Sequence, residues 1–229
     1  MSKKEKAKLV ETAKKYSPEE AIKLVKQTSW AKFKESVDMA IKLDVDVKKG
    51  GFSIRGFVPL PHGSGKKVKV AVIAKADKLE EAKAAGADVM GAEDLIEKIS
   101  KGFFGFDVVL ATPDMMSQVG KLGKILGTKG LMPNPKSGTV TMDIKKVVTE
   151  FKSGKMEFRM DKGGVVHLLL GKVDFPEEHL VDNLKTAVTS VYKTKPSGTK
   201  GNYIKSITIS STMGPAIKID QKELIEQDE

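Results

Sequence analysis

Few residues in this chain have types and spacings that could support catalysis. Residues 63–66, Gly-Ser-Gly-Lys, resemble part of a phosphate-binding loop, but Leu60 stands where that loop needs its first glycine and Lys67 where it needs Ser or Thr. The chain has no cysteine, which excludes disulfides and thiolate catalysis, and its three histidines lie far apart along the sequence, without the local spacing of metal ligands. No nucleophile stands at a diagnostic spacing from a base, and the glycine-rich fingerprint of dinucleotide-binding proteins is absent. We therefore expect no enzymatic activity, no metal and no cofactor.

The charge pattern favours a polyanionic partner. The 229 residues carry 40 Lys+Arg and 30 Asp+Glu, a formal net charge of +10. Residues 1–67 hold 16 basic and 8 acidic side chains, and residues 181–218 hold six lysines against a single acid, Asp182. Clustered cations attract phosphates, whose neutralisation releases counterions and drives association. The alternative is a solvated surface that keeps the protein in solution.

Four segments have compositions suited to binding. Residues 127–130 form a Gly-x-x-Gly loop, which approaches phosphates in some RNA binders but is also common where helices end. Residues 131–138, with two prolines, suit either docking or packing between domains. Residues 210–215, Ser-Ser-Thr-Met-Gly-Pro, combine hydroxyls with a glycine that permits close backbone approach, or form a β-bulge. In a split β-α-β arrangement, residues 32–36 could lie opposite them, with Phe33 either packing on RNA or in the core.

The elements that must position these segments near the N-terminus are a helix and two strands. Ser17 as N-cap, Pro18 in the first turn and Glu20 three residues after the cap predict a helix that ends near residues 28–29. Mostly alternating apolar residues predict a strand over residues 33–47. A turn at residues 48–51 and a partner strand from Phe52 would close a hairpin.

The C-terminal part repeats this mixture of strands and helix, which indicates an α+β domain. The expected elements are strands at 156–160 and 165–171 around a turn at 161–164, a helix at 176–193, a strand at 204–209, an interruption at 211–215 and extended structure at 216–219.

The middle of the chain has a different pattern. Residues 68–73 and 108–111 are continuous apolar strands, as in a sheet covered on both faces. Helices are expected at 76–85, 92–100 and 114–126, with a short strand at 89–90. The alternation predicts an inserted three-layer, Rossmann-like α/β domain with a mainly parallel sheet over residues 68–156. Residues 1–67 and 157–229 would then form one discontinuous, split β-α-β domain, joined to the insert by two hinges.

Together these residues resemble the large-subunit ribosomal protein L1 family. The most specific part is residues 116–135, MSQVGKLGKILGTKGLMPNP, which resembles the family signature throughout. Supporting matches are Lys-Phe-Lys-Glu-Ser-Val at 32–37, Arg-Gly-x-x-x-Leu-Pro-His-Gly at 55–63, Asp-Lys-x-Gly-x-x-His at 161–167 and Ser-Thr-Met-Gly-Pro at 211–215. The sequence departs from the family at Gly51 and Phe52, where an Asp-Gln pair is usual, and this affects the expected turn.

The resemblance implies a cytoplasmic, ribosome-bound protein that acts as a monomer without membrane partners. Its implied partners are the stalk region of large-subunit rRNA beside the exit site, deacylated exit-site tRNA, whose release it assists, and its own operon mRNA, whose translation it represses. The implied core of the RNA contact is Phe33, Ser211, Thr212, Met213 and Gly214. Weaker candidates on the same domain are Lys32, Lys34, Lys162, His167 and Lys172.

The residues themselves leave two other functions open. One is an α/β enzyme that binds a nucleotide or sugar phosphate at the strand ends of the insert, which that ligand would stabilise against heat. The other is a KH-like module that binds single-stranded RNA through residues 127–130, in which Lys129 would be essential.

Overall fold

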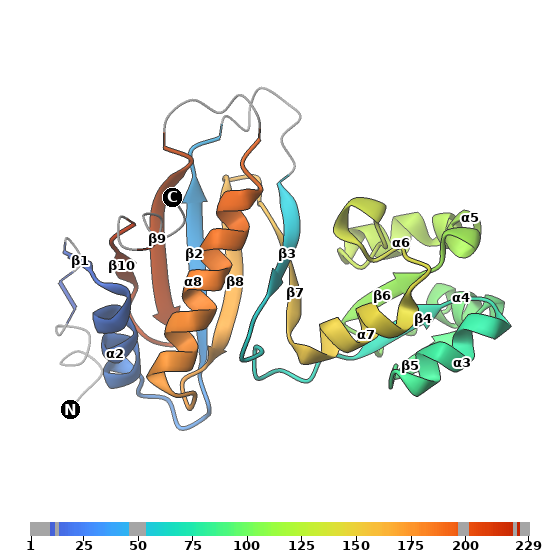
Figure 1. Ribbon diagram of the computed structural model, residues 1–229, viewed down its shortest axis with the longest axis horizontal. Coiled ribbons are helices and arrows are strands. Elements are labelled where there is room, and N and C mark those ends of the chain that lie inside the picture. The colour runs from blue at the N-terminus through green and yellow to red at the C-terminus, as the bar shows by residue number, and fades with distance from the viewer. Residues whose placement is uncertain (1–9, 12–13, 46–53, 197–201, 222–223, 225–229) are drawn as a thin grey trace. The chain divides into compact units, whose positions relative to one another are not determined.

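The computed structural model describes residues 10–11, 14–45, 54–196, 202–221 and 224 (Figure 1). The chain divides into two compact units. We call Met1–Lys66 with Gly154–Glu229 the terminal unit and Lys67–Ser153 the inserted unit. Among the described residues, none of the helices has the length and apolar character needed to cross a membrane.

The terminal unit is built on a five-stranded sheet in the order β1-β10-β9-β2-β8. Its strands are β1 (Lys15–Tyr16), β2 (Ser36–Leu43), β8 (Val165–Lys172), β9 (Ile204–Ser211) and β10 (Ile217–Ile219). Neighbours are antiparallel except β1 and β10, which are parallel. Strands from both ends of the chain therefore form one largely antiparallel sheet, as the sequence predicts.

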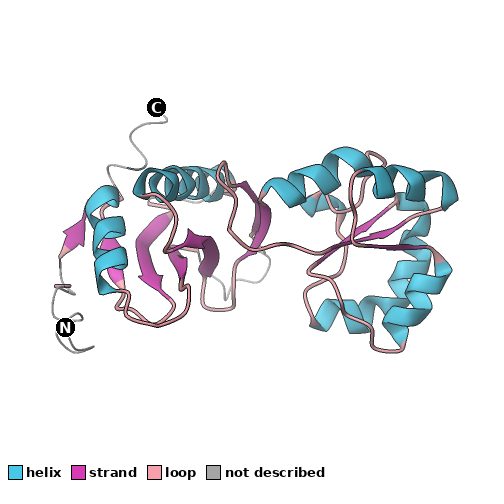
Figure 2. Ribbon diagram, turned by 90° about the horizontal axis from the view of Figure 1, so that it is seen from below, coloured by secondary structure: helices cyan, strands magenta, loops and turns pink. Residues whose placement is uncertain are grey.

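Two helices, α2 (Pro18–Thr28) and α8 (Glu177–Lys193), cover one face of this sheet (Figures 1 and 2). The start of α2 is as predicted, because Ser17 Oγ accepts a hydrogen bond from the Glu20 N–H and Pro18 stands in the first turn. Helix α8 begins directly after Pro176, with Glu177 and Glu178 in its first turn, where the helix dipole favours negative charge.

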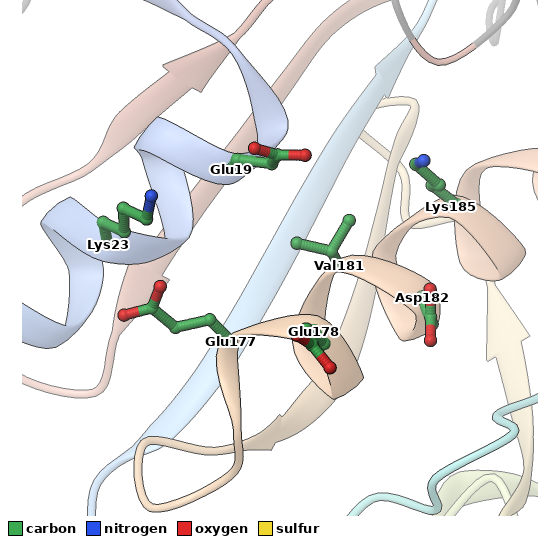
Figure 3. A pocket seen from close by; sticks show the side chains of 7 residues that line it. All are labelled: Glu19, Lys23, Glu177, Glu178, Val181, Asp182 and Lys185. Atoms are coloured by element: carbon green, nitrogen blue, oxygen red, sulfur yellow. The ribbon is translucent and has the colours of Figure 1, made fainter.

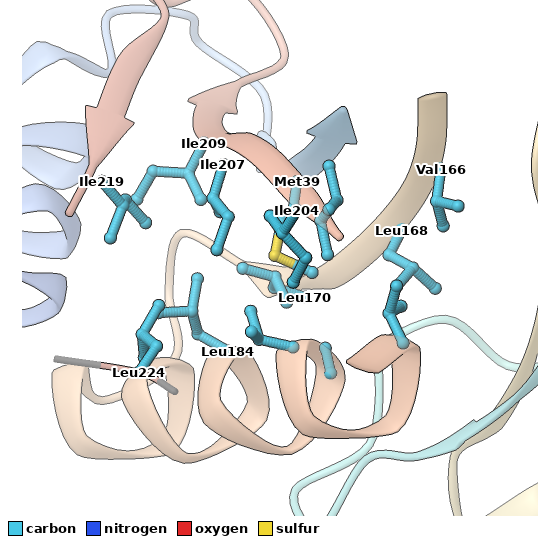
Figure 4. Packing of buried hydrophobic residues seen from close by; sticks show 14 of the residues in the cluster. Met39, Val166, Leu168, Leu170, Leu184, Ile204, Ile207, Ile209, Ile219 and Leu224 are labelled. Carbon is cyan, nitrogen blue, oxygen red and sulfur yellow. The ribbon is translucent and has the colours of Figure 1, made fainter. Parts of the chain in front are cut away.

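The core of the terminal unit lies between α8 and the sheet. In β2, alternate side chains are fully buried, from Val37 to Leu43, while those between them are polar or small and partly exposed. Figure 4 shows Leu184 of α8 beneath apolar side chains of β8 and β9. Each such side chain contributes roughly 1.5–3 kcal/mol when fully buried, so the helical face of the sheet holds the fold together. The side chains of β2 on the opposite face of the sheet lie outside this core.

A second, two-stranded sheet pairs β3 (Arg55–Pro59) with β7 (Lys155–Arg159). The predicted hairpin between β2 and β3 is wrong, because β8 and β9 already occupy both edges of β2. The predicted turn, including Gly51 and Phe52, lies outside the described residues. The strand predicted from residue 33 begins at Ser36, because residues 29–35 form a loop.

The inserted unit contains a parallel sheet in the order β5-β4-β6, as predicted. Its elements are β4 (Val70–Ile73), β5 (Val89–Gly91), β6 (Val108–Ala111), α3 (Ala76–Ala84), α4 (Glu93–Ser100) and α7 (Ile144–Ser153). All four residues of β4 are buried, which explains its continuous apolar sequence.

Two features of the inserted unit differ from the prediction. The single helix expected over residues 114–126 is a series of short turns: 3₁₀ at Pro113–Met115, α5 (Met116–Val119), 3₁₀ at Gly120–Leu122 and α6 (Gly123–Thr128). Gly120 and Gly123 begin the second 3₁₀ turn and α6, and glycine disfavours a continuous helix. Helix α7 was not predicted, although Ile144, Val148 and Phe151 recur at helical spacing on its buried side.

Candidate nucleic-acid interface

Two loops of the terminal unit meet at one end of the five-stranded sheet. One is residues 29–35, between α2 and β2, and the other is residues 212–216, between β9 and β10. We call the exposed side chains Trp30, Lys32, Phe33, Lys34, Thr212 and Met213 the tip surface. The segment at 211–215 was expected to interrupt a strand, but it reverses the chain between two antiparallel strands.

The pairing of β2 with β9 brings the two loops together. Val37 lies opposite Ser211 in the sheet. One residue further on, the Ser36 N–H donates to Thr212 Oγ1 at 2.9 Å and the Thr212 N–H donates to the Ser36 carbonyl at 3.0 Å. The exposed Thr212 is thereby held against β2, although 176 residues separate it from Ser36.

The carboxylate of Glu35 connects the two loops from beneath. Glu35 is only 1% exposed. Its Oε1 accepts hydrogen bonds from Ser29 Oγ at 2.8 Å, the Trp30 N–H at 3.1 Å and the Ala31 N–H at 2.9 Å. Its Oε2 accepts the Met213 N–H at 3.0 Å. One buried anion therefore fixes the backbone of both loops, and each of its bonds is charge-assisted.

These contacts keep Glu35 ionised. Burial favours the neutral carboxyl and raises the pKa, but hydrogen bonds from Ser211, Ala31, Met213 and Ser29 together lower the pKa to about 2, from an ordinary 4.5. The Ser211 hydroxyl is buried and approaches the carboxylate, although it forms no hydrogen bond of regular geometry with any residue that the structure describes.

Large apolar side chains project from this frame into solvent. Phe33 is 56% exposed, Met213 45% and Trp30 39%. The Trp30 Nε1–H donates to the Met213 carbonyl at 2.9 Å, which joins the loops a second time and fixes the indole. Phe33 is thus a surface residue, and the interpretation of it as core is wrong. The predicted contact residues differ in burial, since Ser211 is buried while Thr212 and Met213 are exposed.

Lysines surround the apolar side chains. Lys32 and Lys34 are exposed, and Lys34 Nζ lies 2.9 Å from an Asp174 carboxylate oxygen in an open ion pair that raises the pKa of Lys34. Lys172 Nζ donates to Ser36 Oγ at 2.8 Å. Exposed ion pairs are worth little, so the pair with Asp174 is easily exchanged for a phosphate.

The sheet face opposite the helices is largely polar and extends away from the tip surface. It carries Asp38 and Lys42 of β2 and Thr208 of β9, and exposed His167 lies opposite Ala40. Burial raises the pKa of Asp38, while the charges of Lys172 and His167 act in the opposite direction.

Lys162 is the predicted site residue that the fold places away from the others. It stands in the turn between β7 and β8, where Val165 pairs with Lys42, whereas Lys172 pairs with Ser36 at the tip. Six residues of strand separate these ends, or about 20 Å at 3.3 Å per residue. Eight of the ten predicted residues therefore lie at the tip, whereas His167 lies part-way along the sheet and Lys162 at its far end.

A groove between α2 and α8 has the opposite electrostatic character (Figure 3). It has a volume of about 400 Å³ and is lined by four carboxylates, two lysines and one valine: Glu19, Lys23, Glu177, Glu178, Val181, Asp182 and Lys185. The excess of carboxylates makes this groove unfavourable for a phosphate backbone.

The Gly-x-x-Gly segment of the inserted unit does not form a phosphate cradle. It is the end of α6, where the Gly130 N–H donates to the Gly127 carbonyl and the Leu131 N–H to the Leu126 carbonyl. Lys129 Nζ lies over the Phe104 ring, 4.1 Å from its centroid. In the following proline-rich loop, Leu131 and Met132 pack against the inserted unit's own core.

Sequence reasoning from residue types missed two components of the tip. Glu35 was included only as part of a matching segment, and Trp30 was not included. The signal for Glu35 was a lone acid in an otherwise basic loop, and the signal for Trp30 was that it is the only tryptophan of the chain.

A comparison with protein families gives a match that includes every residue of the tip surface. Residues 25–215 match the model of the ribosomal protein L1p/L10e family. The matched range begins within α2, covers the entire inserted unit and ends at Pro215, two residues after Met213 of the tip surface.

Proposed function

We propose a role for this chain from the premise that it belongs to the ribosomal protein L1p/L10e family. Membership makes it a non-enzymatic constituent of the large ribosomal subunit that binds rRNA, and hence a ribosome-bound cytoplasmic protein. The α/β-enzyme alternative is thereby removed. Our proposal is that the tip surface binds the stalk region of large-subunit rRNA beside the exit site.

The observation that carries this proposal is the joint exposure of Phe33, Thr212 and Met213 on a rigid frame. Exposed apolar side chains normally cost solubility, and here they stand together at one end of a sheet. Because Glu35 and the β2–β9 pairing fix both loops, little conformational entropy is lost when a partner binds.

The chemistry of the surface suits folded RNA. The minor groove of an RNA helix is wide and shallow, and it presents 2′-hydroxyls and base edges to a flat protein surface. Thr212 and nearby backbone groups can bond to 2′-hydroxyls, while Phe33 and Met213 contact riboses or bases. Lys32, Lys34 and Lys172 supply salt-dependent attraction to phosphates.

Two observations favour this surface over others on the described residues. The groove between α2 and α8 is acidic and would repel RNA. The backbone N–H groups of Gly130 and Leu131 are bonded within α6 and its end, which argues against a KH-like use of that loop.

We extend the proposal to the finer roles that membership suggests. The protein acts as a monomer within the ribosome, assists release of deacylated tRNA from the exit site and represses translation of its own operon mRNA by binding a structure similar to the rRNA stalk. Lys121 and Lys124, exposed on the inserted unit, are suitable cations for the tRNA contact.

A binding titration tests the rRNA contact. The probe is a transcript of the large-subunit rRNA stalk, and the proteins are wild type, Thr212→Ala and Met213→Asp. Removing a specific interaction with RNA costs roughly 1–3 kcal/mol, so we expect affinity to fall by about 5- to 150-fold. The matched control is Met142→Asp, which changes a methionine of the inserted unit that is also about half exposed.

The titration has a clear contrary result. Near-wild-type affinity for both tip variants, with circular dichroism showing that they are folded, would refute the assignment of this surface.

A further inference from the structure

We propose that Trp30 is a further RNA-contact residue, and that its indole stacks on an unpaired nucleobase of the bound RNA. This inference rests on the proposed function and adds to it a residue that lies outside the set implied by the family resemblance. The partner chemistry is specific: a base that is splayed out of its helix and therefore offers a π-face.

The first support is the position of Trp30. Six large hydrophobic side chains are exposed among the described residues: Trp30, Phe33, Phe103, Met142, Tyr192 and Met213. Half of these belong to the tip surface. A tryptophan that remains 39% exposed beside Phe33 and Met213 enlarges one apolar patch rather than forming another.

The second support is how the ring is held. The Trp30 Nε1–H donates to the Met213 carbonyl at 2.9 Å, and the Trp30 backbone N–H donates to Glu35 Oε1 at 3.1 Å. The one polar group of the indole is therefore bonded within the protein, while 39% of the residue's surface remains exposed. Because ring and backbone are both fixed, stacking costs little rotamer entropy.

The physical fit is to a base rather than to a phosphate. Stacking of a base on an aromatic side chain depends on the π-face, which every base has, and needs no hydrogen bond from the indole. Lys32 and Lys34, in the same loop, can hold the adjoining phosphates. The loop thus offers a stacking ring together with cations, the combination found in proteins that bind unpaired nucleotides.

An alternative role for Trp30 is purely structural: its N–H would position Met213 and the ring would not touch the RNA. The two roles differ in which part of the side chain matters. Trp30→Phe keeps an aromatic face but loses the donor to Met213, whereas Trp30→Ala loses both.

The experiment combines these variants with fluorescence. Trp30 is the chain's single tryptophan, so all tryptophan emission reports this site. On titration with the rRNA stalk transcript, we expect quenching of wild-type emission and protection of the residual emission from acrylamide. Trp30→Ala should bind about 5- to 100-fold more weakly, and Trp30→Phe within about threefold of wild type.

A matched control is available at the opposite end of the sheet. Tyr192 is 38% exposed, nearly the same as Trp30, and its ring contacts Tyr203, next to the start of β9. Tyr192→Ala should bind the transcript as wild type does. Circular dichroism melts establish that each variant is folded.

The outcomes separate the two proposals. Equal losses for Trp30→Phe and Trp30→Ala would overturn the stacking role in favour of positioning. Wild-type binding without any change in tryptophan emission would overturn it while leaving the proposed function intact. Failure of the wild type itself to bind the transcript would overturn both.

Discussion

Replacing Glu35 by Gln tests whether a buried anion holds the tip surface together. The amide has almost the same shape, but it is neutral, and in either orientation its NH₂ group faces an N–H donor, that of Ala31 at one oxygen position or that of Met213 at the other. A folded-state pKa of about 2 against an ordinary 4.5 is equivalent to about 3 kcal/mol of stabilisation by the charge, at 1.36 kcal/mol per pKa unit. Solvent near the surface loops reduces this figure, so we expect the free energy of unfolding of Glu35→Gln at pH 7 to be about 1–3 kcal/mol lower than that of wild type.

The depressed pKa of Glu35 also determines how the stability difference between wild type and Glu35→Gln changes with pH. The pKa of Glu35 is depressed in the folded state. The stabilisation by its charge is therefore fully present above about pH 4.5 and is lost as the pH falls towards 2. At pH 3 the contribution of the charge should be smaller than at pH 7 by up to about 2 kcal/mol. The stability gap between wild type and Glu35→Gln should therefore narrow on acidification.

Urea unfolding at pH 7 and pH 3, followed by the emission of the single tryptophan, measures this gap in the unit that contains both residues. Glu35→Asp provides a control that keeps the charge but shortens the side chain. A gap that is equal at the two pH values, or absent at both, would refute the reasoning that an ionised Glu35 organises the loops.

Three further predictions follow from single residues. Gly214→Ala should weaken binding of the rRNA transcript, because the new Cβ would lie 2.4 Å from Ser211 Oγ, whereas Gly123→Ala, with nothing within 4 Å, should leave binding unchanged in the same titration. Lys34→Ala should lower the slope of log K against log salt by about 1, because one cation no longer neutralises a phosphate. The control Lys23→Ala, in the acidic groove, should keep the wild-type slope. A wild-type slope for Lys34→Ala as well would contradict a role for Lys34 in phosphate binding. Asn183→Ala should lower the free energy of unfolding by about 1–3 kcal/mol in urea titrations. The buried amide accepts a hydrogen bond from the His62 N–H and donates to the carbonyls of Gly63 and Leu170. Wild-type stability would show that these bonds are dispensable.

Elements with strong local signals could be predicted from the sequence. Ser17 and Pro18 mark the start of α2 because capping depends only on neighbouring residues, and the alternation in β2 follows from one face being buried. Strand partners are different, because a period of two says that a segment is extended but not what lies beside it. The predicted β2–β3 hairpin is wrong for this reason, since β2 pairs with strands more than 120 residues away.

The tip surface shows the same limit. The hydroxyls and Met213 in residues 210–215 indicate a binding segment, and the resemblance includes Phe33. The role of Glu35 depends on donors from Ser29, Trp30 and Ala31 together with Met213, which is 178 residues away. No local pattern contains that convergence, because only the β2–β9 pairing produces it.

The absence of cysteine makes a direct test of the central claim possible. Ala216→Cys lies beside the tip surface and Tyr192→Cys at the opposite end of the sheet, and each can carry a single iron chelate that cleaves nearby RNA by hydroxyl radicals. In large subunits reconstituted with these proteins, the account predicts strong cleavage of the stalk rRNA from position 216 and weak or no cleavage from position 192. Cleavage of the stalk from position 192 with none from position 216 would contradict it.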